Sequence, residues 1–338
     1  MGDKRLKITG TGISLPEFRL TNDMLSSMVD TNDEWIVSHT GIKERRVELE
    51  RSSSELAFEA AEAALADAGR SGSDMDFVIT ATLSPEYRFP ATACLVQERV
   101  GAKNAFSFDV SAGCTGFIYA LDLAGLYISS GRAKKGLVVA TETLSKMTDY
   151  SDRSTCVLFG DGAGAAVVEA AEDGTGLLAS YIAADCNDGK PSKLCARNNL
   201  PPAPFDPVTG AYDPALREGN PPPEYTVMNG RAVFEFAVAA APRSLDICFE
   251  LAGLAPKDIS SFIIHQANLR IIDSIIRRYG LPPEKVPVNI DKYGNMSAVC
   301  VPVLLHETLK SGGIQPGDTA ALVAFGAGLT YGAAILRF

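Results

Sequence analysis

Hydrophobic and polar positions change their spacing repeatedly along the chain, between a helical period and short apolar runs. In residues 53–69, SSELAFEAAEAALADAG, apolar side chains recur at helical spacing, which predicts a helix that ends at Gly69. A polar link follows, and the apolar run FVIT at 77–80 then predicts a buried strand. Because helices and strands alternate in this way in much of the chain, we expect a largely parallel sheet covered by helices.

The chain also contains an internal duplication. ADAGRSGSDMDFVIT and ELAGLAPKDISSFII share an Ala-Gly helix end, a polar link, an aspartate and an apolar strand, at a constant offset of 184 residues. Three pairs of segments match in the same order: 66–80 with 250–264, 129–142 with 310–326, and 159–170 with 325–338. We therefore predict two halves, residues 1–175 and 176–338, that form one compact unit.

Two such halves, related by pseudo-symmetry, predict an α/β fold of five layers, αβαβα, with central helices buried between two sheets. The segment 115–131 is apolar nearly all round, as a central helix requires. The uncharged run 319–336 is interrupted by Gly326, Gly328 and Gly332. We expect a buried hairpin there rather than a membrane span.

A proline-rich segment separates the regular parts of the two halves. Residues 186–225 hold nine of the 19 prolines, which excludes a regular helix or a central strand. Two interpretations remain open, a solvated connection and a lid or pocket wall, because long ordered loops are often functional.

Composition narrows the class of protein. A hydrophobic content of 46% with 21% charged residues is typical of a soluble globular protein. The net charge of −10 argues against a general binder of nucleic acid or of anionic membranes. The seven cysteines are scattered and show neither paired nor zinc-like spacing, which favours a reducing cytoplasm and no metal site.

Three residues at predicted strand ends combine into a chemical hypothesis. Cys114 lies in DVSAGCTGFIYAL, where a strand gives way to an apolar helix whose N-terminus stabilises a thiolate. His265 follows the strand SSFII, and Asn295 lies close to the position that the 184-residue offset pairs with Cys114. Pseudo-symmetry then brings the three turns together. A thiolate attacks an acyl thioester, while imidazole and amide N–H groups stabilise an enolate, and backbone N–H groups near Gly326–Gly328 stabilise an oxyanion.

Each of these residues taken alone has an ordinary structural interpretation. A single cysteine before a buried helix is more often a small core residue than a nucleophile. A single histidine after a strand is more often a hydrogen-bonded structural residue than a catalyst. The hypothesis therefore depends on the joint placement of the three residues.

Several long motifs resemble those of the β-ketoacyl-acyl-carrier-protein synthase III family of the thiolase superfamily, over nearly the whole chain. They occur in the family's order: TNDEWIVSHTGIKERR (31–46), SAGCTGF, DRSTCVLFGDGAGAAVV (152–168), VMNGRAVFEFAV (227–238), HQANLRII and YGNMSAV. The resemblance implies a thiolase-like fold and a cytoplasmic enzyme of fatty acid synthesis without a cofactor or metal.

The resemblance also implies a mechanism. Cys114 would accept an acyl group from acyl-CoA, and His265 and Asn295 would stabilise the enolate formed when a malonyl thioester, expected on acyl carrier protein, loses CO₂. The product would be a 3-oxoacyl thioester. Implied contacts of coenzyme A are Thr31, Trp35, Arg153, Gly230, Phe234, Ala267 and Asn268. The small residues beside Cys114 would leave room for the pantetheine arm.

Further residues implied by the family concern selectivity and assembly. Phe89, Leu144 and Phe159 match the wall of the acyl pocket, although simple core packing is an alternative for them. The residue matching Phe89 reaches across from the other subunit in the family, which implies a homodimer. The resemblance also implies that the carrier protein docks at Arg270, Arg277 and Arg278.

The chain departs from the family pattern at His39, where an arginine is expected near the coenzyme A phosphate, and at Glu235, where a basic residue is usual. These departures leave the acyl donor open, and also whether the acceptor is bound to carrier protein or to coenzyme A. A condensing enzyme or acyltransferase of secondary metabolism is the alternative function. A degradative thiolase would need a second cysteine in the turn 326–328, and a non-catalytic acyl-binding partner would not need all three of the residues Cys114, His265 and Asn295.

Overall fold

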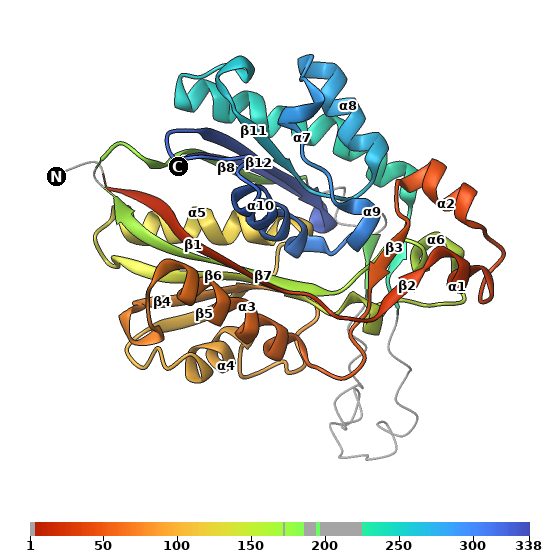
Figure 1. The fold of residues 1–338 in the computed structure, drawn as a ribbon, viewed down its shortest axis with the longest axis horizontal. Helices are drawn as coiled ribbons and strands as arrows, with labels where there is room; N and C mark the ends of the chain where they lie inside the picture. Colours follow the sequence, from red (N-terminus) through yellow and green to blue (C-terminus); the bar gives the residue numbers. More distant parts are fainter. Residues whose placement is uncertain (1–3, 172, 186–193, 197–224) are drawn as a thin grey trace, which may run out of the picture.

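Helices and sheets stack in five layers in the computed structural model, which describes residues 4–171, 173–185, 194–196 and 225–338 (Figure 1). The outer helices on one side are α3 (Ser53–Ala68) and α4 (Thr92–Arg99), and those on the other side are α7 (Gly230–Ala252) and α8 (Leu269–Tyr279). Two sheets lie inside them and enclose the central helices α5 (Gly116–Ser129) and α10 (Cys300–Lys310). The predicted αβαβα architecture is confirmed.

Each sheet is built from one part of the chain. The first has the order β1-β7-β6-β4-β5, from β1 (Arg5–Ser14), β7 (Gly162–Ala171), β6 (Lys135–Glu142), β4 (Phe77–Ala81) and β5 (Phe106–Val110). The second has the order β11-β12-β13-β8, from β11 (Ser261–Ile264), β12 (Thr319–Gly326), β13 (Thr330–Arg337) and β8 (Gly176–Ala184). We retain the two-half division as an interpretation that this strand assignment supports.

The expectation of a largely parallel sheet is wrong. Only β4 with β5, β4 with β6, and β11 with β12 run parallel among the described pairs, whereas β1, β7, β8 and β13 pair antiparallel with their neighbours. The C-terminal hairpin explains part of the difference, because a short turn returns the chain antiparallel beside itself. That hairpin is confirmed, with Gly326 opposite Thr330 at its end.

The duplication is visible in local geometry. Helices α3 and α7 end at Gly69 and Gly253, with φ/ψ of 62°/39° and 65°/32°, respectively. A 3₁₀ turn follows each, η1 (Gly72–Asp74) and η5 (Pro256–Asp258), and its last aspartate accepts a backbone N–H three residues before it, at 2.9 and 2.8 Å. The same sequence pattern therefore gives the same helix end in both halves.

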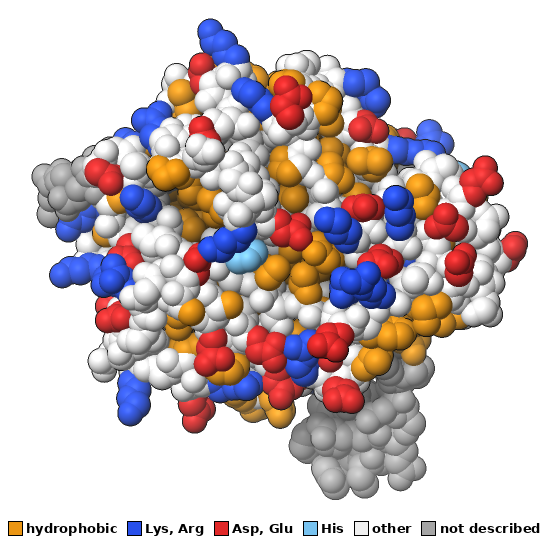
Figure 2. Space-filling model, viewed as in Figure 1, with side chains coloured by type: hydrophobic (Ala, Val, Ile, Leu, Met, Phe, Trp, Pro, Cys, Tyr) orange, Lys and Arg blue, Asp and Glu red, His pale blue; other side chains and the backbone are white. Residues whose placement is uncertain are grey.

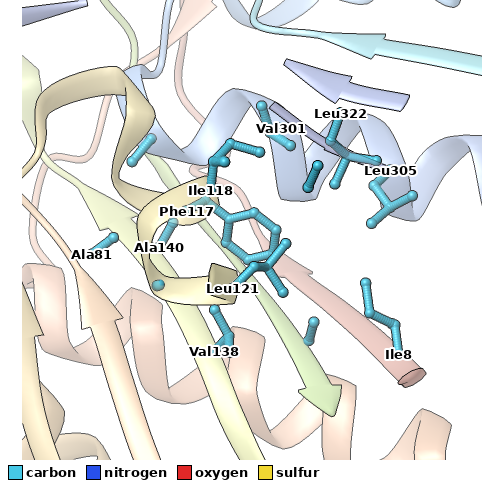
Figure 3. Close-up of a cluster of buried hydrophobic side chains, with 14 of the residues drawn as sticks. Ile8, Ala81, Phe117, Ile118, Leu121, Val138, Ala140, Val301, Leu305 and Leu322 are labelled. Atoms are coloured by element: carbon cyan, nitrogen blue, oxygen red, sulfur yellow. The ribbon is translucent and has the colours of Figure 1, made fainter. Parts of the chain in front are cut away.

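The central core lies around α5 and α10 (Figure 3). Phe117, Ile118 and Leu121 of α5 are fully buried and meet Val301 and Leu305 of α10. Both sheets contribute to the same cluster, for example through Ile8, Val138 and Leu322. A helix covered by a sheet on each side has little room for polar side chains, which explains the apolar sequence of α5.

The remaining described elements are short and lie mainly beside the site: β2 (Arg19–Thr21), α1 (Asn22–Ser26), α2 (Asp33–Thr40), β3 (Glu44–Arg46), α6 (Arg153–Cys156), β9 (Leu194–Cys195), β10 (Val227–Met228) and α9 (Ile290–Tyr293). Within the described ranges no helix is both long and apolar enough to cross a membrane. Acidic and basic side chains are interspersed on the face shown in Figure 2. Most of the proline-rich segment 186–225 lies outside the described residues.

Candidate active site

Two matching turns meet at the centre of the molecule. The 3₁₀ turn η2 (Gly113–Thr115) precedes α5, and η7 (Ser297–Val299) precedes α10. The 184-residue offset aligns Gly113 with Ser297, and both have left-handed backbones, with φ of 56° and 51°. Cys114 and Ser297 line one cavity. The expectation that pseudo-symmetry brings these turns together is confirmed.

Cys114 lies at the start of α5 and is 5% exposed. Its Sγ packs against Gly326 so closely that a Cβ at Gly326 would lie 2.7 Å from the sulfur. Burial raises the pKa of Cys114 to about 11. Hydrogen bonding from the Ser297 hydroxyl and from the backbone of Ala327 and of Cys114 itself lowers this pKa, but by less than burial raises it. The thiol is therefore protonated at neutral pH, and the helix N-terminus does not by itself make it a thiolate.

The glycines beside Cys114 have a different role from the one expected. A Cβ at Gly113 would lie 2.7 Å from the carbonyl oxygen of Ala327, and one at Gly116 would lie 2.9 Å from the Cβ of Ala81. These positions are small because neighbouring backbone and strands approach them closely. Space for a ligand comes instead from the cavities described below.

His265 follows β11 and is 1% exposed. Its backbone N–H donates to the carbonyl of Val323, which holds the residue at the end of the sheet, and its ring meets Phe325 edge-on at 5.3 Å. Neither ring nitrogen has a hydrogen-bond partner, and burial lowers the pKa of His265 to about 3. The imidazole is therefore neutral and has one N–H free to donate.

Asn295 is held by both halves of the molecule. Its backbone N–H donates to the carbonyl of Leu158 and its carbonyl accepts from Gly160, at 2.9 and 3.0 Å. The side-chain Oδ1 accepts the N–H of Ser297 at 2.9 Å. Because the amide oxygen is engaged in this way, the amide nitrogen is left to donate.

Cys114, His265 and Asn295 line one cavity of about 230 Å³. Eight other residues named from the sequence share that lining: Trp35, His39, Phe159, Gly230, Phe234, Ala267, Asn268 and Gly326. Hydrogen bonds hold the loop that follows His265 in place. Asn268 caps α8 and donates to the carbonyl of His39 at 3.0 Å. The Gln266 side chain accepts the N–H groups of Asn289 and Ile290.

An aromatic and cationic cluster lies at one side of this cavity. The Arg153 guanidinium lies 4.9 Å from the centre of the Trp35 ring, and the His39 ring stacks on Trp35 at 4.4 Å. Arg153 also donates to the carbonyl of Asp30 at 2.8 Å. Thr31 and Arg153 do not line the cavity itself, but Thr31 Oγ1 is buried without a partner. A flat aromatic ring with an exposed guanidinium suits a base and its phosphates.

A smaller cavity of about 60 Å³ lies on another side of Cys114. Leu144 and Phe159 line it together with Leu83, Met147 and Ala327, so both residues lie where an acyl pocket could extend from Cys114. Phe89 does not line either cavity and is 86% exposed. Gly328 lies against Thr330 rather than against Cys114, and the residue of this turn whose backbone acts on the thiol is Ala327.

The three arginines predicted to dock a carrier protein lie on α8 and are exposed. Arg270 donates to the carbonyl of Ser38 at 2.9 Å, and Arg278 pairs with Asp246 at 3.0 Å. Because Ser38 belongs to α2, this end of α8 lies beside the Trp35 cluster.

Sequence reasoning missed three side chains of the site. Phe325 packs on His265 and lines the larger cavity, Ser297 lines the smaller one, and Glu142 is fully buried and raises the pKa of Cys114 through its charge. Phe325 directly precedes the glycine turn, and the duplication offset pairs Ser297 with Gly113, so both had a usable signal. Glu142 had a weaker one, a carboxylate at the end of an apolar strand.

Comparison with known proteins agrees with this geometry. Two family profiles match: 3-oxoacyl-[acyl-carrier-protein (ACP)] synthase III at residues 108–186, and its C-terminal counterpart at residues 249–338. A curated β-ketoacyl-[acyl-carrier-protein] synthase III of Aquifex aeolicus is 45% identical over 98% of this chain and 99% of its own. The crystal structure of 3-oxoacyl-[acyl-carrier-protein] synthase III from that organism has a TM-score of 0.87 at 44% identity, covering 98% of this chain and all of its own. A Thermus thermophilus β-ketoacyl-[acyl-carrier-protein] synthase III gives 0.88 at 44% identity, with 98% of each chain covered.

In the described part of the chain, no group of three His, Cys, Asp or Glu side chains is arranged to hold a metal ion. The matching profiles and relatives, the five-layer fold and the convergence of Cys114, His265 and Asn295 on one cavity agree with one another. The chain belongs to the 3-oxoacyl-[acyl-carrier-protein] synthase III family, condensing acyltransferases with the thiolase fold.

Proposed function

We propose that the chain condenses an acyl-CoA with malonyl-acyl carrier protein, giving a 3-oxoacyl-acyl carrier protein, coenzyme A and CO₂, the reaction that starts fatty acid synthesis. The observation that carries the proposal is the meeting of one thiol and two neutral donors, Cys114, His265 and Asn295, in a single cavity. The names of the relatives, found over nearly the whole chain, support the carrier-protein acceptor.

In the first half-reaction Cys114 attacks the acyl thioester and coenzyme A leaves. Negative charge develops on the acyl oxygen, and the backbone N–H groups of Ala327 and Cys114 are the donors that stabilise it. The acyl chain then occupies the smaller cavity between Leu144 and Phe159. Its small volume favours a short acyl group.

In the second half-reaction the malonyl group loses CO₂ and its enolate attacks the acyl carbon. The neutral imidazole of His265 and the amide nitrogen of Asn295 donate to the enolate oxygen. Neutral donors suit this step because decarboxylation itself generates the nucleophile and no base has to remove a proton.

The adenine and phosphates of coenzyme A bind at Trp35, Arg153 and Thr31, and the pantetheine arm passes Gly230, Phe234, Ala267 and Asn268. The exposed guanidinium groups of α8, at Arg270, Arg277 and Arg278, receive the acidic surface of the carrier protein.

The active assembly is a homodimer in which Phe89 enters the acyl cavity of the partner subunit. Two features support this. Phe89 exposes 86% of a large apolar side chain, and β5 is an edge strand of its sheet.

The test is a panel of acyl-CoA donors, from two to ten carbons, with intact-protein mass spectrometry. We expect a gain of one acyl group per chain, absent in Cys114→Ala. Cys248→Ala is the matched control, because Cys248 is also buried but lies on the outer helix α7, and it should be labelled like the wild type. Failure of the whole panel to label the wild type would refute the proposal.

A further inference from the structure

Acylation of Cys114 requires that its thiol loses a proton, and most groups around the thiol only donate. The backbone N–H groups of Ala327 and Cys114 are donors, and His265 makes no hydrogen bond. Burial keeps the proton on the sulfur, as its raised pKa indicates. Deprotonation therefore requires a proton acceptor near the thiol, and the lowered pKa of His265 makes its imidazole a poor one.

Glu142 is a buried carboxylate near enough to this thiol for its charge to raise the pKa of Cys114. It ends β6 and has no exposed surface. Its Oε2 accepts the N–H of Leu83 at 3.1 Å and the Ser84 hydroxyl at 2.7 Å, but its Oε1 has no hydrogen-bond partner. A carboxylate oxygen that is both buried and unpartnered is costly unless it has a function.

Ser297 connects this carboxylate with the cysteine. Its hydroxyl lowers the pKa of Cys114 and of Glu142, which means that it favours the charged form of each. The hydroxyl nevertheless makes no hydrogen bond of ordinary geometry. Ser297 lines the same cavity as Cys114, and its unpartnered hydroxyl is available to bond either group.

The backbone of Ser297 indicates that its side chain is kept for a reason. Its φ of 51° lies in the left-handed region, where glycine is favoured, and the equivalent position in the other half, Gly113, is a glycine with φ of 56°. The second half therefore retains a hydroxyl at a position where the first half has none. No other described non-glycine residue has a positive φ.

We propose that Glu142 accepts the proton of Cys114 through the hydroxyl of Ser297, and keeps this proton for as long as the acyl group is on the cysteine. The inference rests on the proposed function. The pair assigns a proton-holding role to two residues that the sequence hypothesis left out.

The proton balance closes over the two half-reactions. During acylation the Sγ–H bond breaks, the proton passes to Ser297 Oγ while the Ser297 proton moves to Glu142, and the Sγ–acyl bond replaces the bond to coenzyme A. The coenzyme A thiolate leaves and takes a proton from water. During condensation the enolate expels Cys114 as a thiolate, and the proton stored on Glu142 returns to it through Ser297. One solvent proton is consumed per cycle, as the overall reaction requires.

The electrostatic surroundings allow this exchange. Burial, together with Asp161, raises the pKa of Glu142 to about 7, against the lowering by Ser84, Leu83 and Ser297. Asp161 itself accepts from Glu48 and Ser145, and it faces Lys146. The negative charge of Glu142 raises the pKa of Cys114, so protonation of the carboxyl removes that opposition. The buried charge stays the same when the proton moves between the two groups.

The test is the rate of Cys114 acylation by acetyl-CoA, followed by quenched intact-protein mass spectrometry from pH 5.5 to 9. In the wild type we expect the rate to rise through an inflection near pH 7 and then level off. Glu142→Gln should slow acylation by about 10²-fold at pH 7 and lose that inflection, with a rate that continues to rise toward pH 9. Ser297→Gly should behave similarly, because glycine keeps the left-handed backbone but removes the hydroxyl.

The controls separate this role from a structural one. Glu169→Gln changes a carboxyl at the opposite end of the strand pair, where it bonds Arg70, and should leave the profile unchanged. If either variant acylates at the wild-type rate, or more slowly but with the inflection near pH 7 retained, the relay is wrong. If Glu142→Gln does not fold, Ser297→Gly decides the question. Failure of the wild type itself to be acylated would instead refute the proposed function.

Discussion

The turns η2 and η7 are the same piece of architecture with different chemistry. Each places a residue with left-handed backbone just before a buried helix, and each lies at the boundary between the two halves. The first carries a glycine and the thiol of Cys114, whereas the second carries Ser297 and Ala298 and follows Asn295. The duplicated fold supplies the positions, and in the proposed mechanism the substitutions within it divide the reaction between the halves.

This comparison explains why the site lies where it does. A helix buried between two sheets has its N-terminus at the centre of the molecule, so both duplicated turns face one cavity. The backbone of Asn295 then pairs with residues 158–160 of the other half and fixes their relative position. We therefore expect substitutions in the two turns to change the free energy of unfolding by unequal amounts.

The largest expected effect on stability is at the glycine of the first turn. In Gly113→Ala the alanine has to adopt the left-handed backbone of Gly113, and its new Cβ lies 2.7 Å from the carbonyl oxygen of Ala327. We expect a loss of about 3 kcal/mol in the free energy of unfolding, from the strained backbone and the overpacking together. Urea denaturation followed by circular dichroism measures it.

The second turn provides the control for that change. Ser297→Gly replaces a strained residue with one that accepts the same φ, and we expect it to alter the free energy of unfolding by less than about 1 kcal/mol. Equal losses in the two variants would contradict the unequal roles assigned to the two turns.

A smaller expected effect is on the stability of the folded chain at acidic pH. Burial lowers the pKa of His265 to about 3 in the folded chain, from 6.5 when it is exposed. Between these values the unfolded chain binds more protons, so His265 makes stability fall as the pH decreases below 6.5. From pH 7 to 5.5 we expect the wild type to lose about 1 kcal/mol more than His265→Asn, since one pH unit is worth at most about 1.4 kcal/mol for one group.

Urea denaturation of both proteins at the two pH values measures this difference. A variant that loses as much stability as the wild type would mean that His265 does not stay neutral in the folded chain.

Much of the fold could be predicted because local signals repeat. The glycine ends at 69 and 253, the apolar sequence of α5 and the glycines of the C-terminal hairpin each have one physical interpretation. Strand direction could not be predicted in the same way. An apolar strand such as β7 has the same sequence pattern whether it pairs parallel or antiparallel, because both of its faces are buried.

The part of the site that lies on turns could be predicted, because sequence motifs and the duplication both identify turns. These signals pointed to Cys114, His265 and Asn295, but not to Glu142, because a carboxylate at the end of an apolar strand is only a weak signal of burial. The roles of Gly113 and Gly116 were misread for a similar reason. A small residue indicates close approach, but the sequence does not say whether a ligand or the chain's own backbone comes close.

The central claim is that the first half holds the acyl group while the second half stabilises the enolate. The most direct measurement is the acyl occupancy of Cys114 and the yield of 3-oxoacyl product in the same quenched sample of His265→Ala, supplied with acetyl-CoA and malonyl-acyl carrier protein. The account predicts nearly one acyl group per chain and product formation reduced at least about 10²-fold. A variant that forms product at the wild-type rate, or that is no longer acylated, would contradict it.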